Sequence, residues 1–292
     1  ELSTQNRFFH SQLEFIEVFL ERGGFDVIVG NPPWLKITFE EKGVISETFP
    51  EVLIKKLSAP KVRELQSEFL NKEHSKEMYF KEYIGTDSTS TFLNSFQNYV
   101  LLKGQQTNLY KCIIDNCFNL ISNNGFTGLI HPEGVYDDPN GGKLRRILYR
   151  RLLYHFQFIN ELKLFQEVHN QTLFSLNIYK RFSSEINFYS INNLFVPQTI
   201  DPSFTDNSKS ISGGYKIKDK NKFIWNIKPH HQRIVNVNDT MLRRINLFFG
   251  ETSEYDETKF ISIHTSTVIK IIDLFSENEK LKNHLENITV CL

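Results

Sequence analysis

Four consecutive residues, Asn31-Pro32-Pro33-Trp34, combine an amide, two rigid prolines and a flat aromatic ring. An exocyclic amine on adenine is a weak nucleophile because its lone pair is delocalised into the base. The side-chain oxygen of Asn31 and the backbone carbonyl of Pro32 could each accept one N6 hydrogen, which would localise the lone pair and aim it at an electrophilic methyl group. Trp34 offers a face on which an extruded base could stack. The four residues therefore predict amine methylation, without a metal ion or a covalent intermediate.

The tetrad directly follows Phe25 to Gly30, a short run rich in apolar and β-branched residues. Such a run predicts a buried parallel strand, which the two prolines would end because they cannot donate to a strand ladder. An Asn/Asp/Ser-Pro-Pro-aromatic tetrad should arise by chance on the order of once in a hundred chains of this length. The alternative interpretation is structural, with a strand ended by prolines and a tryptophan in the core.

Alternating elements are expected around this strand. Apolar residues at helical spacing predict helices over 4–22, 108–122 and 143–153, and apolar runs predict strands over 126–130, 156–164 and 172–182, the last two in a hairpin-like arrangement. A turn at 123–125 and a loop over 131–142 should connect them. The polar, mostly helical residues 35–104 predict an insertion over the mouth of the sheet. The order of elements indicates an α/β fold.

Beyond Ser183 the sequence changes to short strand-like pieces and a Ser/Gly/Lys-rich stretch over 201–222, followed by helical spacing over 240–249 and 265–275. We therefore expect a domain boundary near Ser183. Residues 1–183 would form the catalytic part, and residues 184–292 would begin a smaller α+β region that recognises the target.

Residues Phe8 to Trp34 resemble the segment that leads into the catalytic tetrad of large adenine-N6 DNA methyltransferases of the restriction-modification (type IIG-like) and phage-defence group. Residues 104–112 and 128–136 resemble later motifs of that group, and the likeness covers about residues 5–182. It implies part of a Rossmann-like class I methyltransferase sheet, with Phe25 to Gly30 as the fourth strand, 126–130 as the fifth and the 172–182 region closing the sheet with an antiparallel strand pair. It also implies S-adenosylmethionine as methyl donor and duplex DNA as substrate.

The first motif of that family, a strand ending in an Asp/Glu-Pro-x-x-Gly-x-Gly turn around the methyl donor, does not occur in residues 1–24. The double glycines at 23–24, 141–142 and 213–214 lack its spacing and a preceding buried strand. The chain also begins with Glu1 in place of Met. We therefore expect an upstream segment or a partner chain to supply this part, unless the chain is a remnant.

Further residues are candidates for binding. His131, Pro132 and Glu133 follow the predicted fifth strand at its carboxyl end, where open α/β sheets place ligands, and they could contact cofactor or base; the alternative is a simple loop turn. The resemblance places Tyr110 near the target base, although its spacing also fits a core residue. Tyr179 or Phe182 could supply a second aromatic face for the base.

Two basic clusters could contact nucleic acid. One lies on the helix predicted over 143–153 and consists of Lys143, Arg145, Arg146, Arg150 and Arg151. It could bind phosphate or form a solvated helix face. The other is interleaved with Tyr215, Phe223 and Trp225 and consists of Lys216, Lys218, Lys220, Lys222, Lys228, His230, His231 and Arg233. It is typical of a nucleic-acid-facing strand surface, and equally of charged turns.

Overall composition excludes several other classes. Lys and Arg total 34 and so do Asp and Glu, so any contact with DNA must be local. Three cysteines without metal spacing argue against a disulfide framework and a zinc site, and favour a reducing cytoplasm. No apolar run reaches the length that spans a bilayer, and no signal pattern opens the chain.

The residues and the resemblance together favour methyl transfer from S-adenosylmethionine to adenine N6 in a specific duplex sequence, within a restriction-modification or phage-defence system. Two alternatives stay open. The same tetrad could serve RNA adenine or a protein glutamine, or the chain could be a non-catalytic DNA-recognition fragment or subunit.

Overall fold

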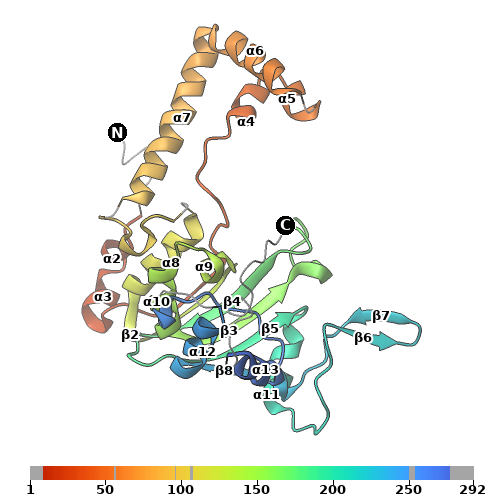
Figure 1. Ribbon diagram of the computed structural model, residues 1–292. Helices are drawn as coiled ribbons and strands as arrows, with labels where there is room; N and C mark the ends of the chain where they lie inside the picture. Colours follow the sequence, from red (N-terminus) through yellow and green to blue (C-terminus); the bar gives the residue numbers. More distant parts are fainter. Residues whose placement is uncertain (1–8, 56, 96, 106–107, 250–253, 277–292) are drawn as a thin grey trace, which may run out of the picture. The chain divides into compact units, whose positions relative to one another are not determined.

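The computed structural model describes residues 9–55, 57–95, 97–105, 108–249 and 254–276 (Figure 1). The chain divides into two compact units. Residues 1–32 and 113–292 form the sheet unit, and residues 33–112 form the helical unit. Some positions named by the sequence predictions lie outside the described residues, namely 4–8, Gln106, Thr107 and Cys291.

Six strands of the sheet unit form one mixed sheet in the order β1-β2-β4-β3-β5-β8. Their bounds are β1 Phe25–Gly30, β2 Ile121–Pro132, β3 Leu152–Ile159, β4 Leu173–Tyr179, β5 Asn187–Leu194 and β8 Val235–Asn238. Strands β1, β2, β3 and β5 are parallel to one another, and β4 and β8 are antiparallel to them. The carboxyl ends of the four parallel strands therefore meet at one edge, called here the carboxyl edge.

This topology confirms the mixed α/β class, the parallel pairing of Phe25 to Gly30 and the antiparallel pairing of the two later predicted strands. Strand β4 lies between β2 and β3 and pairs with both. The equivalence of β1 and β2 to the fourth and fifth strands of a methyltransferase sheet stays a prediction.

The prediction that Phe25 to Gly30 is buried is wrong, because none of the six residues of β1 is buried. The strand lies at the edge of the sheet, and Val27 and Val29 are 61% and 79% exposed. The single helix predicted before it is interrupted at Phe15 and consists of α2 (Ser11–Glu14) and α3 (Ile16–Arg22). The apolar residues whose spacing predicts this helix are exposed, Leu13 and Leu20 among them.

Two glycines allow β1 and β2 to come together at their amino ends. Gly24 has φ +145°, and a Cβ there would lie 2.6 Å from the carbonyl oxygen of Leu120; a Cβ on Gly125 would lie 2.6 Å from that of Phe25. The register shifts here, because Phe25 pairs with Ile121 whereas Val27 pairs with Phe126. The predicted turn at 123–125 is thus an irregularity inside a longer β2.

Helices of the sheet unit pack around these strands. They are α8 Leu109–Leu120, which begins in the helical unit, α9 Gly134–Asp137, α10 Gly142–Arg151, α11 Ile200–Thr205, α12 Asp239–Phe249 and α13 Thr267–Ser276. Short 3-10 helices are η2 Asn160–Leu162, η3 Pro197–Thr199, η4 His231–Arg233 and η5 Tyr255–Glu257. Helix α10 packs on the sheet through buried Leu144, Leu148 and Tyr149, and the Tyr149 ring stacks on Phe188 of β5 at 6.1 Å. Each of the two leucines contributes about 1.5–3 kcal/mol on burial.

The sheet continues past the expected domain boundary near Ser183. Strand β5 is parallel to β3, and β8 pairs with β5, so residues on both sides of Ser183 share one sheet. The break in composition marks instead a surface hairpin, formed by β6 (Lys216–Asp219) and β7 (Lys222–Trp225), which extends away from the sheet in Figure 1.

The helical unit contains α4 Glu41–Ser46, α5 Glu51–Ile54, α6 Ala59–Leu70, α7 Glu73–Asn94 and the 3-10 helix η1 Val100–Leu102. Its small core consists of Ile45, Val52, Val62 and Leu65, with Phe49 and Leu57 packed against it. The unit encloses the stretch 35–104 for which the sequence predicts a helical insertion. Within the described ranges, no helix has the length and apolar character needed to cross a membrane.

Candidate catalytic site

Asn31 directly follows the carboxyl end of β1, so it lies at the carboxyl edge of the sheet. Its side chain is exposed and makes no hydrogen bond to another described residue, which leaves its amide oxygen available as an acceptor. Pro32 is buried. Because β2 and β3 are parallel to β1, Glu133 and Asn160 follow their strands at this same edge.

Pro33 and Trp34 belong to the helical unit. Trp34 is half-buried, and its segment is held by a backbone hydrogen bond from the Leu109 N–H to the Leu35 carbonyl at 3.0 Å and by a bridge between Lys36 and Asn108. Tyr110, in the same unit, is 2% exposed. Its burial fits the alternative that it is a core residue.

His131 and Tyr179 are both fully buried, on adjacent strands. His131 Nδ1 lies 2.9 Å from the Pro132 carbonyl oxygen, and His131 Nε2 lies 2.7 Å from the Tyr179 hydroxyl oxygen. Burial lowers the pKa of His131 to about 4, so its ring is neutral near pH 7. Both ring nitrogens are committed to protein groups, and the Tyr179 ring packs edge-on against Phe118 at 5.3 Å. Neither residue presents an open face to a ligand.

Glu133 anchors a second buried polar group. Its carboxylate lies 3.1 Å from His155 Nε2 and accepts a hydrogen bond from Gln157 at 2.8 Å. Burial by itself would raise the pKa of Glu133, but the charge of His155 and hydrogen bonds from His155, Ser175 and Gln157 hold it below its usual value. Glu133 is thus an ionised structural acceptor that links β2 to β3.

The topology separates Phe182 from Asn31. Phe182 follows the carboxyl end of β4, and β4 is antiparallel to the other central strands, so Phe182 lies toward the opposite edge of the sheet. The prediction that Phe182 contributes to the base sandwich does not fit this position. Residue spacing could not reveal the position of Phe182, because that position depends on the direction in which β4 runs between β2 and β3.

A loop that the sequence predictions passed over lies at the carboxyl edge instead. Residues 160–172 connect β3 to β4 at this edge. Asn160 is fully buried and donates to the Phe165 and Val168 carbonyls at 2.8 and 2.9 Å, while its side-chain oxygen accepts from the Phe165 N–H at 3.0 Å. The sequence predictions placed Asn160 inside the strand expected over 156–164, whereas β3 ends at Ile159.

The arginines of α10 mostly serve the fold. Arg145 is 3% exposed and donates to the Glu257 carbonyl at 2.9 Å. Arg146 and Arg150 both contact buried Asp256, at 3.0 and 2.8 Å. Arg151 lies over the Phe118 ring at 4.5 Å. Of the predicted DNA-backbone cluster, Lys143 alone is exposed, so neither a free phosphate surface nor a solvated helix face describes this helix.

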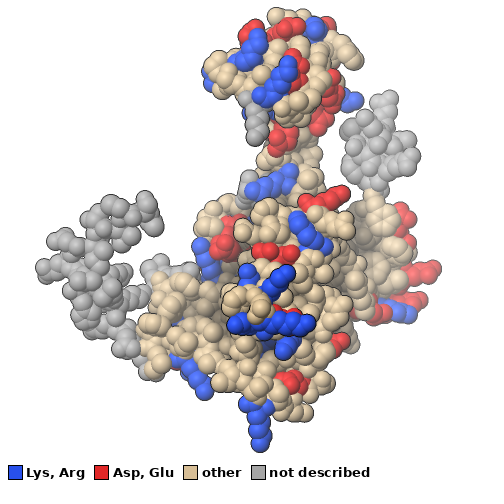
Figure 2. Space-filling model, turned by 90° about the vertical axis from the view of Figure 1, so that its right-hand side faces the viewer, with Lys and Arg blue, Asp and Glu red and all other residues tan. Residues whose placement is uncertain are grey.

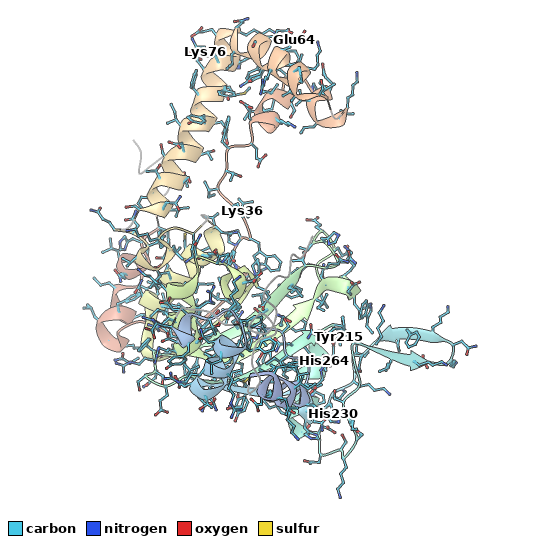
Figure 3. The ribbon with its side chains drawn as sticks, viewed as in Figure 1. Lys36, Glu64, Lys76, Tyr215, His230 and His264 are labelled. Carbon is cyan, nitrogen blue, oxygen red and sulfur yellow. The ribbon has the colours of Figure 1, made fainter. Side chains whose placement is uncertain are left out.

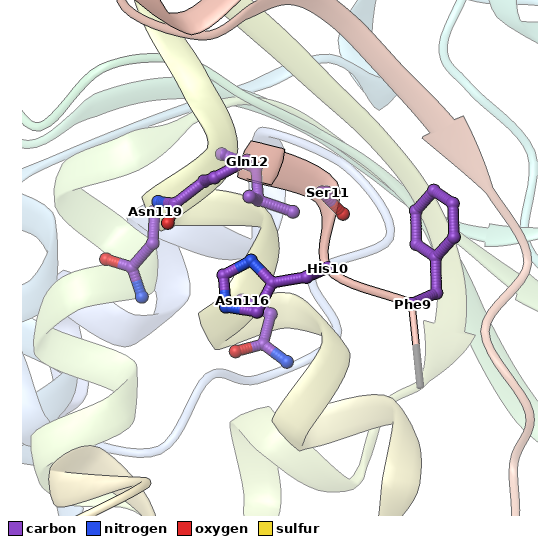
Figure 4. Close-up of a pocket in the computed structure, with 7 residues that line it drawn as sticks. Phe9, His10, Ser11, Gln12, Asn116 and Asn119 are labelled. Atoms are coloured by element: carbon purple, nitrogen blue, oxygen red, sulfur yellow. The ribbon is translucent and has the colours of Figure 1, made fainter. Parts of the chain in front are cut away.

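Two hollows lie elsewhere in the sheet unit. One, of about 270 Å³, is lined by Phe9, His10, Ser11, Gln12, Asn116, Asn119 and Leu120 (Figure 4). Leu120 immediately precedes β2, which places this hollow toward the amino ends of the parallel strands, away from Asn31. The other, of about 500 Å³, includes Asp206, Lys228 and His230 in its lining.

Asp206, His230 and His231 form a cluster whose candidate metal-ligand atoms lie within 4.8 Å of one another. Internal hydrogen bonds occupy these atoms. His230 Nδ1 accepts from the Gln232 N–H at 3.0 Å, so Nε2 carries the proton that faces the Ser210 carbonyl at 2.9 Å. Hydrogen bonds from the backbone of His231 and from Ser208 hold the pKa of Asp206 well below its usual range. The cluster thus ties the segment around 206–210 to η4.

Residues 1–169 match the family described as Eco57I restriction-modification methylase. No curated protein matches the chain. Among solved structures, the chain is similar to the type I restriction-modification system methyltransferase subunit from Streptococcus thermophilus, with 14% identity over 70% of this chain and 30% of that one and a TM-score of 0.31. It is also similar to the ATP-dependent type ISP restriction-modification enzyme LlaBIII bound to DNA, with 14% identity over 63% and 11% of the two chains and a TM-score of 0.31.

The chain spans less than a third of the length of either structure, and at these TM-scores the likeness adds nothing about fold or activity. The family match is different in kind, because it covers more than half of the 292 residues and includes Asn31-Pro32-Pro33-Trp34. The chain belongs to the Eco57I restriction-modification methylase family.

Proposed function

We propose that this chain carries the amine-orienting part of a restriction-modification or phage-defence methyltransferase that transfers a methyl group from S-adenosylmethionine to adenine N6 in duplex DNA. The observation that carries this proposal is the position of Asn31. Its exposed, unbonded amide follows a parallel strand at the carboxyl edge, where open α/β sheets place ligands, and the chain belongs to a methylase family.

In this proposal Asn31 and Pro32 act on the target amine. The amide oxygen of Asn31 and the carbonyl oxygen of Pro32 accept the two N6 hydrogens, so that the nitrogen lone pair is held out of conjugation with the ring and pointed in one direction. The rigid backbone of the two prolines places both acceptors in advance. Trp34 holds the extruded base by stacking.

S-adenosylmethionine, when bound, supplies the electrophilic methyl group. The residues predicted to contact it, His131, Pro132 and Glu133, do not fit that role here, because both His131 nitrogens, the Pro132 carbonyl and the Glu133 carboxylate are engaged within the sheet unit. No step that involves the donor is therefore assigned to them. We propose that another segment or a partner chain pairs with the edge of β1, covers Val27 and Val29, and brings the donor site to Asn31.

Methyl transfer tests the proposal directly. The chain, alone and with the upstream extension or partner encoded beside it, is incubated with radiolabelled S-adenosylmethionine and duplex DNA, and the nucleosides are analysed by mass spectrometry. N6-methyladenine in DNA supports the proposal. Label in RNA or in a glutamine peptide instead would assign the tetrad to another amine, and DNA binding without label in any combination would favour a recognition subunit.

Calorimetry with S-adenosylmethionine separates the donor site from the amine site. Binding in the extended or partnered form but not by the 292-residue chain is the expected result. Binding by the chain alone would contradict the assignment of the donor site to another segment.

A further inference from the structure

The β6–β7 hairpin is a two-stranded ribbon whose two faces differ. Lys216 pairs with Trp225 and Lys218 pairs with Phe223, so these four side chains share one face. The other face carries the pairs Ile217–Ile224 and Asp219–Lys222. Lysines also continue into the turn at Lys220. From Tyr215 to Trp225 the ribbon holds four lysines and one aspartate, a net charge of +3 (4 − 1).

The lysines near the tip are free for a partner. Lys218, Lys220 and Lys222 are exposed, and none of their side chains forms an ion pair or hydrogen bond with another described residue. This differs from α10, whose arginines are engaged inside the protein. In Figure 2, which looks toward the side from which the ribbon extends, basic side chains gather at the centre of the view.

The backbone of the turn supports a role for its lysine. Lys220 has φ +52°, in the left-handed region that favours glycine or asparagine. A lysine there costs folding free energy, and its side chain is exposed. The charged side chain at the tip therefore stands at a position whose backbone favours other residues.

The base of the ribbon is firmly held. The Trp225 ring stacks on Phe195 at 4.7 Å, and Lys216 lies over the Trp225 ring at 4.2 Å. Tyr215 and His264, labelled in Figure 3, meet edge to face at 4.8 Å. Because Trp225 is occupied by Phe195 and Lys216, it offers no free face for stacking an unpaired base. This favours contact with a phosphate backbone over a platform for single strands.

We propose that the β6–β7 ribbon contacts the phosphate backbone of duplex DNA, with Lys218, Lys220 and Lys222 as its phosphate ligands. The major groove of duplex DNA admits a two-stranded ribbon, and the charge of the ribbon is complementary to the phosphates. Lysines supply charge without sequence discrimination, so the ribbon positions the duplex and does not read its bases. The proposal rests on the proposed function, because it takes duplex DNA as the substrate.

The test is fluorescence anisotropy of a short labelled duplex titrated with the 292-residue chain at several salt concentrations. The triple variant K218Q/K220Q/K222Q is compared with K42Q/K76Q/K81Q, which removes equal charge from exposed, unpaired lysines of the helical unit. Each lost phosphate contact should reduce the magnitude of the slope of log K against log salt by about 0.9. The slope of the ribbon variant should therefore be smaller by about 2 to 3, and its affinity for the duplex should be lower by about tenfold or more. The control should bind nearly as the wild type does.

Other results would overturn the proposal. Equal weakening by both variants would show nonspecific charge attraction, and a loss confined to single-stranded DNA would identify a different ligand. Binding of the wild type to phosphatidylserine vesicles but not to duplex DNA would indicate a membrane surface. Duplex binding that depends on the ribbon, without methyl transfer, would support the ribbon proposal and contradict the proposed function. Methyl transfer by the wild type, with unchanged duplex affinity in the ribbon variant, would support the proposed function and contradict the ribbon proposal.

Discussion

The hydroxyl of Tyr179 donates a hydrogen bond of 2.7 Å to Nε2 of His131 in the centre of the sheet. The direction follows from the other ring nitrogen, because Nδ1 lies 2.9 Å from the Pro132 carbonyl and must carry the proton there. A neutral imidazole with one donor and one acceptor satisfies both contacts. The pair therefore fixes one tautomer of His131 and joins β4 to the end of β2.

Replacement of Tyr179 by phenylalanine should lower the free energy of unfolding by about 1–3 kcal/mol, because the buried Nε2 lone pair of His131 loses its donor while the ring packing is retained. Urea denaturation measures this change. Tyr189 is 40% exposed and serves as the matched control, and Tyr189→Phe should cost less than about 0.5 kcal/mol. Similar costs for the two variants would show that the hydroxyl contact contributes nothing.

The stability of the sheet unit should fall as the pH drops from about 6.5 to about 4. Burial lowers the pKa of His131 from 6.5 to about 4, so the folded state resists a proton that the unfolded chain accepts. The neutral ring contributes its full stability above pH 6.5, and up to about 3 kcal/mol is lost by pH 4. The difference in unfolding free energy between the wild type and His131→Gln should shrink by this amount on acidification. A difference that stays constant with pH would contradict it.

Local patterns predicted most of the sheet because they depend on neighbouring residues. The apolar run Phe25 to Gly30, the hairpin-like pair near 156–164 and 172–182 and the helix near 143–153 all form, with ends shifted by a few residues. Burial was not predictable in the same way. Val27 and Val29 look like core residues in sequence, yet they are exposed because β1 lies at a sheet edge, and edge position is a property of the assembled fold.

Long-range partners decided the roles of the polar residues. Arg146 and Arg150 look like a basic helix face in sequence, but Asp256, more than a hundred positions away, binds both. Glu133 was correctly expected to follow a strand at the carboxyl edge, whereas His131 lies inside β2, which ends at Pro132. The burial of both residues in hydrogen-bond networks was not expected. The position of Asn31 depended on one strand and two prolines, and was predictable for that reason.

Replacement of Trp34 by alanine should reduce methyl transfer more than affinity for duplex DNA. Base stacking on an aromatic ring contributes about 1–3 kcal/mol, so loss of the stack should lower kcat/KM about tenfold to a hundredfold. Initial rates give the first quantity and anisotropy the second. A target adenine replaced by 2-aminopurine should fluoresce less brightly in the wild-type complex than in the variant complex, which is the result expected for the proposed stacking of the extruded base on Trp34. Equal loss of rate and affinity would count against stacking.

Replacement of Asp256 by asparagine should destabilise the protein by about 2–3 kcal/mol and leave DNA affinity unchanged. Asp256 is 5% exposed and pairs with Arg146 and Arg150, so its loss removes the carboxylate of Arg150 and leaves Arg146 with Glu257 alone, at 3.1 Å. Glu64→Gln, which breaks the exposed pair with Lys61, should cost less than about 1 kcal/mol. If Asp256→Asn instead tightened duplex binding without loss of stability, the arginines of α10 would be DNA ligands that Asp256 blocks in the wild type.

Replacement of Asn31 by alanine should lower the rate of methyl transfer by about a hundredfold to a thousandfold, the usual effect of removing one polar group aligned with a transition state. Unfolding should be unaffected, because the Asn31 side chain is exposed and bonds to no described residue. Asn123→Ala removes another exposed amide, from the amino end of the sheet, and should change neither quantity.

Asn31→Asp distinguishes an acceptor from a structural residue at this position. It keeps an acceptor oxygen beside the amine, so it should retain more activity than Asn31→Ala. Rates and melting temperatures of both variants provide the comparison. If both variants lost stability in parallel with activity, Asn31 would serve to end β1 at the prolines. The alternative outcome is a lower rate in Asn31→Ala at constant melting temperature, with part of the rate retained in Asn31→Asp. That outcome would support a hydrogen bond from the reacting amine to the amide oxygen of Asn31.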